Sequence, residues 1–84
     1  MPSKLIKLIQ KMKSQPVNIS FEELSYVLLH VGCERNEGKG SHYLFYHPTT
    51  KVRLTVPKKK PVKTCYIRQA YYLFNLEEKL SEKD

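Results

Sequence analysis

A histidine at the start of an aromatic strand is the side chain in this sequence best suited to chemistry. Residues 38–48 read GKGSHYLFYHP, so a turn broken by Gly38 and Gly40 is followed by His42 and then by aromatic residues. Histidine titrates near neutral pH and often acts as a general acid or base, so His42 could exchange a proton with a bound phosphodiester. A surface histidine without chemistry is the alternative. His47 has the opposite parity and suits a structural role in the next turn.

Basic residues on both sides of this strand could hold phosphate groups. The turn before His42 carries a lysine between two glycines, and backbone N–H groups in such a turn can face an anion. Three consecutive lysines stand between two prolines, just before the last expected helix, whose N-terminus also favours anions. A plain hairpin turn and a solvated loop are the alternatives. We expect phosphate contacts from Lys39, Gly40, Ser41, Arg53, Lys58, Lys59 and Lys60.

The composition favours an anionic polymer as the ligand. The chain has 84 residues, with fifteen lysine and arginine residues against eight acidic ones, and a net charge of +7. Such a charge points to nucleic acid first, then to an acidic protein or an anionic membrane surface, although solubility alone could explain it. A domain this short buries only roughly 60% of the surface of its unfolded chain. We therefore expect an open binding surface rather than a large internal pocket.

Neither the cysteines nor the N-terminus suggests a cofactor or a membrane. Cys33 and Cys65 lack the spacing of a metal site, and we expect both to be reduced structural thiols in a cytoplasmic protein. No metal or other cofactor is predicted. Lysines interrupt the N-terminal helix at each turn and no small-residue cleavage site follows, which argues against a signal peptide and a membrane span. Alone, the protein should be a monomer.

Two amphipathic helices are expected before the first strand. The first covers residues 3–14 and is ended by Pro16. Ser20 and Glu23 have the spacing of a capping box and predict a second helix that runs to Gly32. Apolar residues recur at helical spacing in both segments and should enter the core: Leu5, Ile6, Leu8, Ile9, Met12, Phe21, Leu24, Val27, Leu28 and Val31.

Three short strands and a last helix follow. Turn residues and alternation predict antiparallel strands over residues 33–35, 41–47 and 51–56. Thr64 can cap a final helix that bends or restarts at Asn75. We therefore expect an α+β domain with helices on one face of a small three-stranded antiparallel sheet.

The chain is expected to form one domain, residues 1–84, whose sheet keeps one face open. Its parts are an N-terminal helical extension over 1–16, a core over 20–76 and a fraying tail over 81–84. Because strand side chains alternate, one set should pack on the helices: Tyr43, Phe45, Val52, Leu54 and Val56. The other set should face outward: His42, Leu44, Tyr46, Arg53 and Thr55. Leu44 and Tyr46 are too apolar for solvent alone, so we expect this face to contact bases or a protein partner.

Two segments resemble the HicA family of mRNA interferase toxins. The first is KGSHYLFYHP over residues 39–48, in which Gly-Ser-His followed by an aromatic strand is the specific part. The second is LTVP over 54–57, with a basic loop leading to YIRQ over 66–69. The resemblance covers residues 21–74, and the first helix is similar to an extension that some members carry. It implies a fold like that of a double-stranded-RNA-binding domain, with an extra N-terminal helix.

The resemblance also implies a function and a partner. The histidine of the motif, His42 here, would be needed for mRNA cleavage, and a cognate HicB-type antitoxin would cover it. Many members carry a further histidine in the loop after the third strand, where this chain has lysines at 58–60. A second proton-transfer group is therefore unassigned, and Lys39, Lys58 and Tyr46 are the candidates.

Three functions remain open on the sequence, and the ribonuclease toxin is the leading one. A metal-independent endoribonuclease would use His42 as acid or base while the 2′-hydroxyl of RNA attacks the phosphorus. A non-catalytic RNA-binding module would use the same lysines on the phosphates of an A-form helix. A protein-interaction domain would instead dock a partner on Leu44 and Tyr46.

Overall fold

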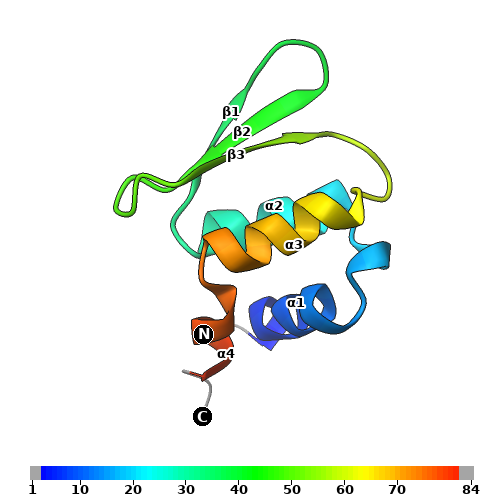
Figure 1. The fold of residues 1–84 in the computed structure, drawn as a ribbon, viewed down its shortest axis with the longest axis vertical. Coiled ribbons are helices and arrows are strands. Elements are labelled where there is room, and N and C mark those ends of the chain that lie inside the picture. Colours follow the sequence, from blue (N-terminus) through cyan, green and yellow to red (C-terminus); the bar gives the residue numbers. More distant parts are fainter. Residues whose placement is uncertain (1–2, 82–84) are drawn as a thin grey trace.

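The protein folds into three layers, a sheet and two layers of helices. The computed structural model describes residues 3–81, so 82–84 of the tail expected to fray lie outside the described part. The elements are α1 (Ser3–Ser14), the 3₁₀ helix η1 (Pro16–Asn18), α2 (Phe21–His30), β1 (Glu34–Glu37), β2 (His42–Tyr46), β3 (Arg53–Pro57), α3 (Thr64–Leu73) and α4 (Leu76–Ser81). The sheet lies uppermost in Figure 1, α2 and α3 form the middle layer, and α1 and α4 lie beneath.

The three strands form one antiparallel sheet in the order β1-β2-β3. In the central strand, Tyr46 pairs with Glu34 of β1 and with Arg53 of β3. The register with β3 continues residue by residue to His42, which lies opposite Pro57. The predicted α+β class is therefore confirmed, and the order α2-β1-β2-β3-α3 is compatible with the fold of a double-stranded-RNA-binding domain.

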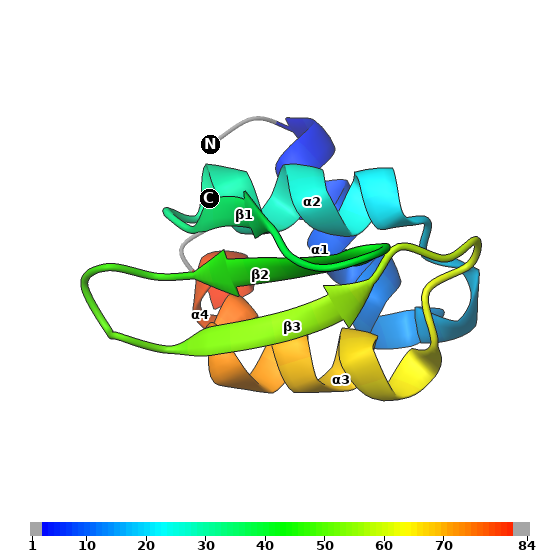
Figure 2. The same cartoon turned by 90° about the horizontal axis from the view of Figure 1, so that it is seen from above.

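One face of the sheet packs on the helices, as the alternation predicts. Phe45 and Val56 are fully buried, and Leu54 is almost so. The Phe21 ring at the start of α2 lies 4.9 Å from the Tyr43 ring and 5.9 Å from the Phe45 ring, centroid to centroid. Figure 2 shows the other face of the sheet toward the viewer, with the helices behind it. The sheet therefore has one buried and one open face.

The N-terminal helix is an integral part of the hydrophobic core. The prediction of a helix over residues 3–14 is confirmed, and α1 packs against α2, α3 and α4. Its buried side chains are the five predicted ones: Leu5, Ile6, Leu8, Ile9 and Met12. Within residues 3–81, no helix has the length and apolar run needed to cross a membrane.

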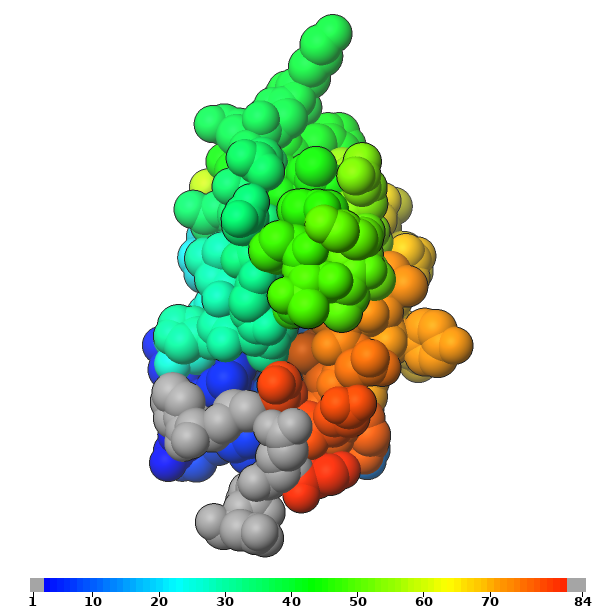
Figure 3. Space-filling view, turned by 90° about the vertical axis from the view of Figure 1, so that its left-hand side faces the viewer, coloured from blue at the N-terminus to red at the C-terminus, as the bar shows by residue number. Residues whose placement is uncertain are grey.

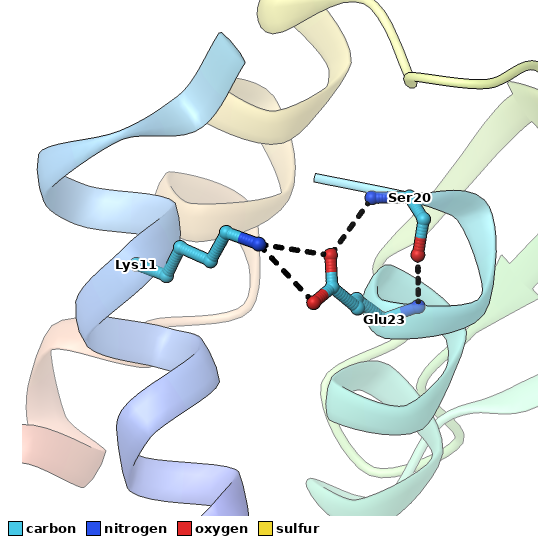
Figure 4. Close-up of polar contacts among 3 residues, drawn as sticks. All are labelled: Lys11, Ser20 and Glu23. Carbon is cyan, nitrogen blue, oxygen red and sulfur yellow. Dashed lines mark hydrogen bonds and ion pairs between the residues drawn. The ribbon is translucent and has the colours of Figure 1, made fainter. Parts of the chain in front are cut away.

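Glu23 joins α1 to the start of α2 (Figure 4). Its Oε1 accepts a hydrogen bond from the Ser20 backbone N–H at 3.0 Å, and its own N–H donates to the Ser20 Oγ at 3.1 Å, which completes the predicted capping box. Lys11 Nζ lies 3.3 and 3.2 Å from the two carboxylate oxygens. The Ser20 N–H and the Lys11 ammonium lower the pKa of the Glu23 carboxyl despite its partial burial.

A second polar contact joins α1, α3 and α4. Tyr71 Oη donates to Glu77 Oε1 at 2.5 Å, and Lys13 Nζ lies 3.3 Å from Glu77 Oε2. Burial, with the Glu77 carboxylate beside it, raises the pKa of Tyr71 to about 12. Asn75 has a φ of +52° and separates α3 from α4, so the predicted restart of the last helix is confirmed.

Some boundaries differ from the sequence prediction. β1 covers Glu34–Glu37 rather than 33–35, because pairing with β2 continues into the segment expected to form a turn. β3 continues to Pro57, which lies in register opposite β2 instead of ending the strand before it. Thr64 is already helical, and the N-cap is Lys63, which makes no side-chain capping bond.

Two core residues lie in the connecting segments, where the sequence prediction missed them. Ile19 is fully buried and Val62 is 1% exposed. The Val62 N–H donates to the Ile19 carbonyl at 2.9 Å and so ties the loop before α3 to the segment before α2. Each stands alone between polar residues and prolines, so no periodic pattern marks it.

Replacement of Phe45 by alanine should destabilise the fold far more than replacement of its neighbour Leu44. Phe45 is fully buried, whereas Leu44 is half-buried and lies on the open face. A Phe→Ala change in a core costs about 3–5 kcal/mol, and we expect less than half of that for Leu44→Ala. Urea unfolding followed by circular dichroism measures the difference. Equal stability of the two variants would show that the sheet packs through its other face.

The stability that Glu23 contributes should disappear in acid. Because its folded-state pKa is lowered, the contribution is present above the ordinary value of 4.5 and is lost as the pH falls through the lower folded-state value. Urea unfolding from about pH 6 to about pH 3 should therefore show the wild type losing its advantage over Glu23→Gln. Glu22→Gln, an exposed carboxylate in the same helical turn, is the control. The same pH dependence in Glu23→Gln as in the wild type would contradict this role.

Candidate nucleic-acid interface

His42 is the first residue of β2 and is exposed at one end of the sheet. Both of its backbone polar groups are bound within the β1–β2 hairpin. Its N–H donates to the Lys39 carbonyl at 3.3 Å, and its carbonyl accepts from the Gly38 N–H at 2.7 Å. The hairpin therefore fixes the backbone of His42 and leaves its side chain accessible.

The turn that precedes His42 requires a glycine and projects from the body of the protein. Gly40 has a φ of +62°, a left-handed conformation that other residues seldom adopt. Lys39, Gly40 and Ser41 are all exposed. Figure 3 shows the segment between β1 and β2 projecting beyond the rest of the surface. An extended ligand could therefore reach this turn without entering a cleft.

The basic loop after β3 lies at the same end of the sheet as this turn (Figure 2). The Lys58 N–H donates to the Ser41 carbonyl at 2.7 Å, which joins the loop to the residue before His42. Lys58, Lys59 and Lys60 are exposed. The predicted phosphate-binding residues of the turn and of the loop thus flank His42 on two sides. Arg53 is the exception, because it lies at the opposite end of β3.

The basic loop leads into the N-terminus of α3. No acidic residue lies in the first turn of this helix, and its N-cap residue, Lys63, makes no side-chain capping bond. The N–H groups of an uncapped first turn and the positive end of the helix dipole favour an anion. This end of α3 therefore adds to the positive character around the lysine loop.

The open face of the sheet carries a line of side chains that starts at His42. Leu44, opposite Thr55, and Tyr46, opposite Arg53, are half-buried on this face. The Arg53 guanidinium carbon lies 5.4 Å from the centroid of the Tyr46 ring. The register is therefore consistent with the predicted set of outward-facing residues. Tyr46 and Arg53 form a cation–π pair on this face.

Asn36 is a further residue of the open face, and the sequence prediction placed it in a turn. It lies in β1 opposite Leu44, whose side chain faces outward. Every residue of β1 is exposed, so no alternation of apolar and polar residues could have revealed the strand. Asn36 brings an amide group to the same face as His42.

Of the three candidates for a second proton-transfer group, only Lys39 belongs to the turn that holds His42. The Lys58 ammonium lies 5.9 Å from the centroid of the buried Phe21 ring, on the helix side of the sheet. Tyr46 is four residues along β2 from His42, which corresponds to about 13 Å. This geometry favours Lys39 over the other two.

His47 has the structural role that its position suggests. Its Nε2 lies 3.1 Å from the Val31 carbonyl, and the Thr50 N–H donates to its Nδ1 at 3.3 Å. The hydrogen must therefore be on Nε2, which donates to Val31. A Cβ atom at Gly32 would lie 3.0 Å from Nε2, and Gly32 has a φ of +111°, so the imidazole fits against a backbone without a side chain. His47 thus ties the β2–β3 turn to the end of α2.

The two cysteines differ in their surroundings. Cys33 is buried, and burial raises the pKa of its thiol to about 11, in keeping with a structural thiol. Cys65 is also a free thiol, but it lies exposed on α3 and does not belong to the core. It follows a basic loop rather than an apolar segment, and helical spacing turns it outward. Among residues 3–81, no group of three or more histidine, cysteine and carboxylate side chains could hold a metal ion.

A pocket of about 330 Å³ lies away from this interface, where the end of α1 meets α3. Its lining residues are Met12, Lys13, Ser14, Pro16, Arg68 and Tyr71. None of them belongs to the sheet or to the turn of His42. The residues around His42 in the turn 39–41 and in the loop 58–60 are exposed, in keeping with an open binding surface.

A comparison with known protein families agrees with the resemblance seen in the sequence. The model for the HicA toxin of bacterial toxin–antitoxin systems matches residues 21–73, from the first residue of α2 to the last of α3. No curated protein and no solved structure matches the chain. Since the match covers more than half of the 84 residues and includes the hairpin of His42, the chain belongs to the HicA family of toxins of bacterial toxin–antitoxin systems.

Proposed function

We propose that this toxin is an endoribonuclease that cleaves mRNA in the cytoplasm, with His42 in proton transfer. The observation that carries the proposal is the exposed position of His42 between two lysine-bearing segments that are hydrogen-bonded to its hairpin. A phosphodiester held by both segments would lie at the imidazole. Membership of the HicA family supports the same activity.

The reaction uses the RNA itself as the nucleophile. The 2′-oxygen attacks the adjacent phosphorus and forms a bond to it, while the bond from phosphorus to the 5′-oxygen breaks. A base accepts the proton of the 2′-hydroxyl, and an acid gives a proton to the leaving 5′-oxygen. The products are a 2′,3′-cyclic phosphate and a 5′-hydroxyl. This route requires no metal ion, and DNA is not cut because it lacks the 2′-hydroxyl.

The lysines and the turn would stabilise the charge that develops on the phosphate. Lys39 and the N–H groups of the turn lie on one side of His42, and the loop of Lys59 and Lys60 lies on the other, whereas the Lys58 ammonium lies over the Phe21 ring. One general acid or base contributes roughly 10²–10⁴-fold, and donors to the phosphate add comparable factors. A modest rate of this kind is sufficient for a toxin that is held in check by an antitoxin.

A HicB-type antitoxin would neutralise the toxin by covering His42. The exposed lysines around the histidine are suited to an acidic surface on that partner. The competing function, a non-catalytic RNA-binding module, uses the same lysines, and the nature of the product ends separates it from the ribonuclease.

His42→Ala should abolish RNA cleavage without unfolding the protein, because the side chain is exposed and its removal takes away the proton-transfer group. We expect a loss of about 10²–10⁴-fold in the cleavage rate. The measurement uses a fluorescent RNA oligonucleotide with excess EDTA, and mass spectrometry to identify 2′,3′-cyclic phosphate ends. His30→Ala, an exposed histidine at the end of α2, is the matched control. Undiminished cleavage by His42→Ala would show that His42 takes no part in the mechanism. If the wild type binds RNA but does not cleave it, the protein is an RNA-binding module and not a ribonuclease.

Association with the antitoxin should be slowed by salt and by loss of a charge in the lysine loop. We compare Lys59→Gln with Lys7→Gln, an exposed lysine on α1 in the layer farthest from the sheet. Stopped-flow association with the cognate antitoxin should slow for Lys59→Gln only, within the roughly 10–10³-fold that electrostatic steering supplies in total. An equal effect of both substitutions would place the antitoxin elsewhere on the surface.

A further inference from the structure

We propose that Tyr46 and Arg53 form a stacking site for one base of a single-stranded RNA whose scissile phosphate lies at His42. The inference rests on the proposed ribonuclease function and extends it to the class of substrate. It starts from the cation–π pair at the end of the open face, which the reaction at His42 does not use.

The pair lies on the face of the sheet that no helix covers, with the guanidinium over the ring. Tyr46 and Arg53 face each other across β2 and β3, with the guanidinium carbon 5.4 Å from the ring centroid. Tyr46 is not among the half-buried apolar residues that pack against the core, unlike Tyr43 three positions earlier on the other face of β2. The ring is therefore not needed to fill the interior. Bases stack on aromatic rings and on guanidinium planes, and this pair offers both.

The pair lies in line with His42. Tyr46 is four positions after His42 in β2, a distance of about 13 Å along the strand. A fully stacked strand rises about 3.4 Å per nucleotide, so the pair lies within about four nucleotides of the scissile phosphate. Leu44 and Thr55 lie between the two ends and present no charge. The RNA can therefore follow β2, with its phosphate at the lysines and one base at Tyr46.

This arrangement favours single-stranded RNA over a duplex. A base reaches the face of a side chain only when it leaves its own helix, as in loops and single strands. An A-form duplex keeps its bases stacked within the helix and presents phosphates and 2′-hydroxyls instead, so it offers no base face to the Tyr46 ring. On the far side of the sheet, α2 and α3 are backed by α1 and α4 (Figure 1). The open face is thus the side of the sheet that the helices leave uncovered, and it carries Leu44 and Tyr46.

The test measures RNA binding rather than cleavage, so its result does not depend on whether His42 is catalytic. The probe is a single-stranded hexanucleotide with 2′-O-methyl sugars, which cannot be cleaved, and with 2-aminopurine placed at each position in turn. We expect Tyr46→Leu to weaken binding roughly 5- to 100-fold, as for the loss of one stacked base, and Tyr46→Phe to retain most of the affinity. Tyr72→Leu, a tyrosine of α3 that is 81% exposed, is the matched control and should not weaken binding.

The outcomes distinguish the possible occupants of this face. Quenching of 2-aminopurine at one position by the wild type, lost in Tyr46→Leu, supports the stacking site even if no cleavage is ever detected. Equal affinities of Tyr46→Leu and Tyr72→Leu overturn it, as does a duplex of the same sequence that binds as tightly as the single strand. Unchanged RNA affinity of Tyr46→Leu with impaired antitoxin binding would also overturn it, in favour of a protein contact. If Tyr46→Leu does not fold, the wild type alone provides the test. Quenching of 2-aminopurine at one position supports the stacking site, and equal quenching at every position, or none, overturns it.

Discussion

The alternation of side chains in the central strand is the constraint on which the rest of the structure depends. Phe45 must be buried against Phe21 of α2, and the strand geometry then places its neighbours on the other face. The outward position of His42 is therefore a consequence of how the core packs. A small domain can in this way present polar and aromatic side chains without a cleft, because the helices cover only one face of its sheet.

The second layer of helices allows one face of the sheet to stay uncovered, because it enlarges the core on the other side. The matched family segment ends with α3, yet α1 and α4 lie outside it and close the side of α2 and α3 that faces away from the sheet. Lys11 binds Glu23 inside the capping box of α2, so α1 is fixed to the first turn of the helix beneath the sheet. Burial of five side chains of α1 adds apolar contacts on the side that the sheet does not cover.

The sequence predicted those features that have a local or periodic signal. The capping box at Ser20, the restart at Asn75 and the alternation around Phe45 each depend on neighbouring residues, and the structure confirms them. Ile19 and Val62 were missed because a single apolar residue in a loop becomes core only when the chain brings two loops together. The direction of the Lys58 side chain likewise depends on how the loop after β3 packs against α2, which the sequence does not specify.

The contact between Gly32 and His47 has a consequence for how such a sequence can change. The imidazole occupies the space that a side chain at position 32 would need, and in return it donates to the carbonyl of Val31. Neither residue can be replaced alone without a clash or a lost hydrogen bond. Natural variants should therefore change both positions at once. Positions 32 and 47 would then covary in an alignment of such sequences, and this covariation would reveal the contact that attaches the β2–β3 turn to α2.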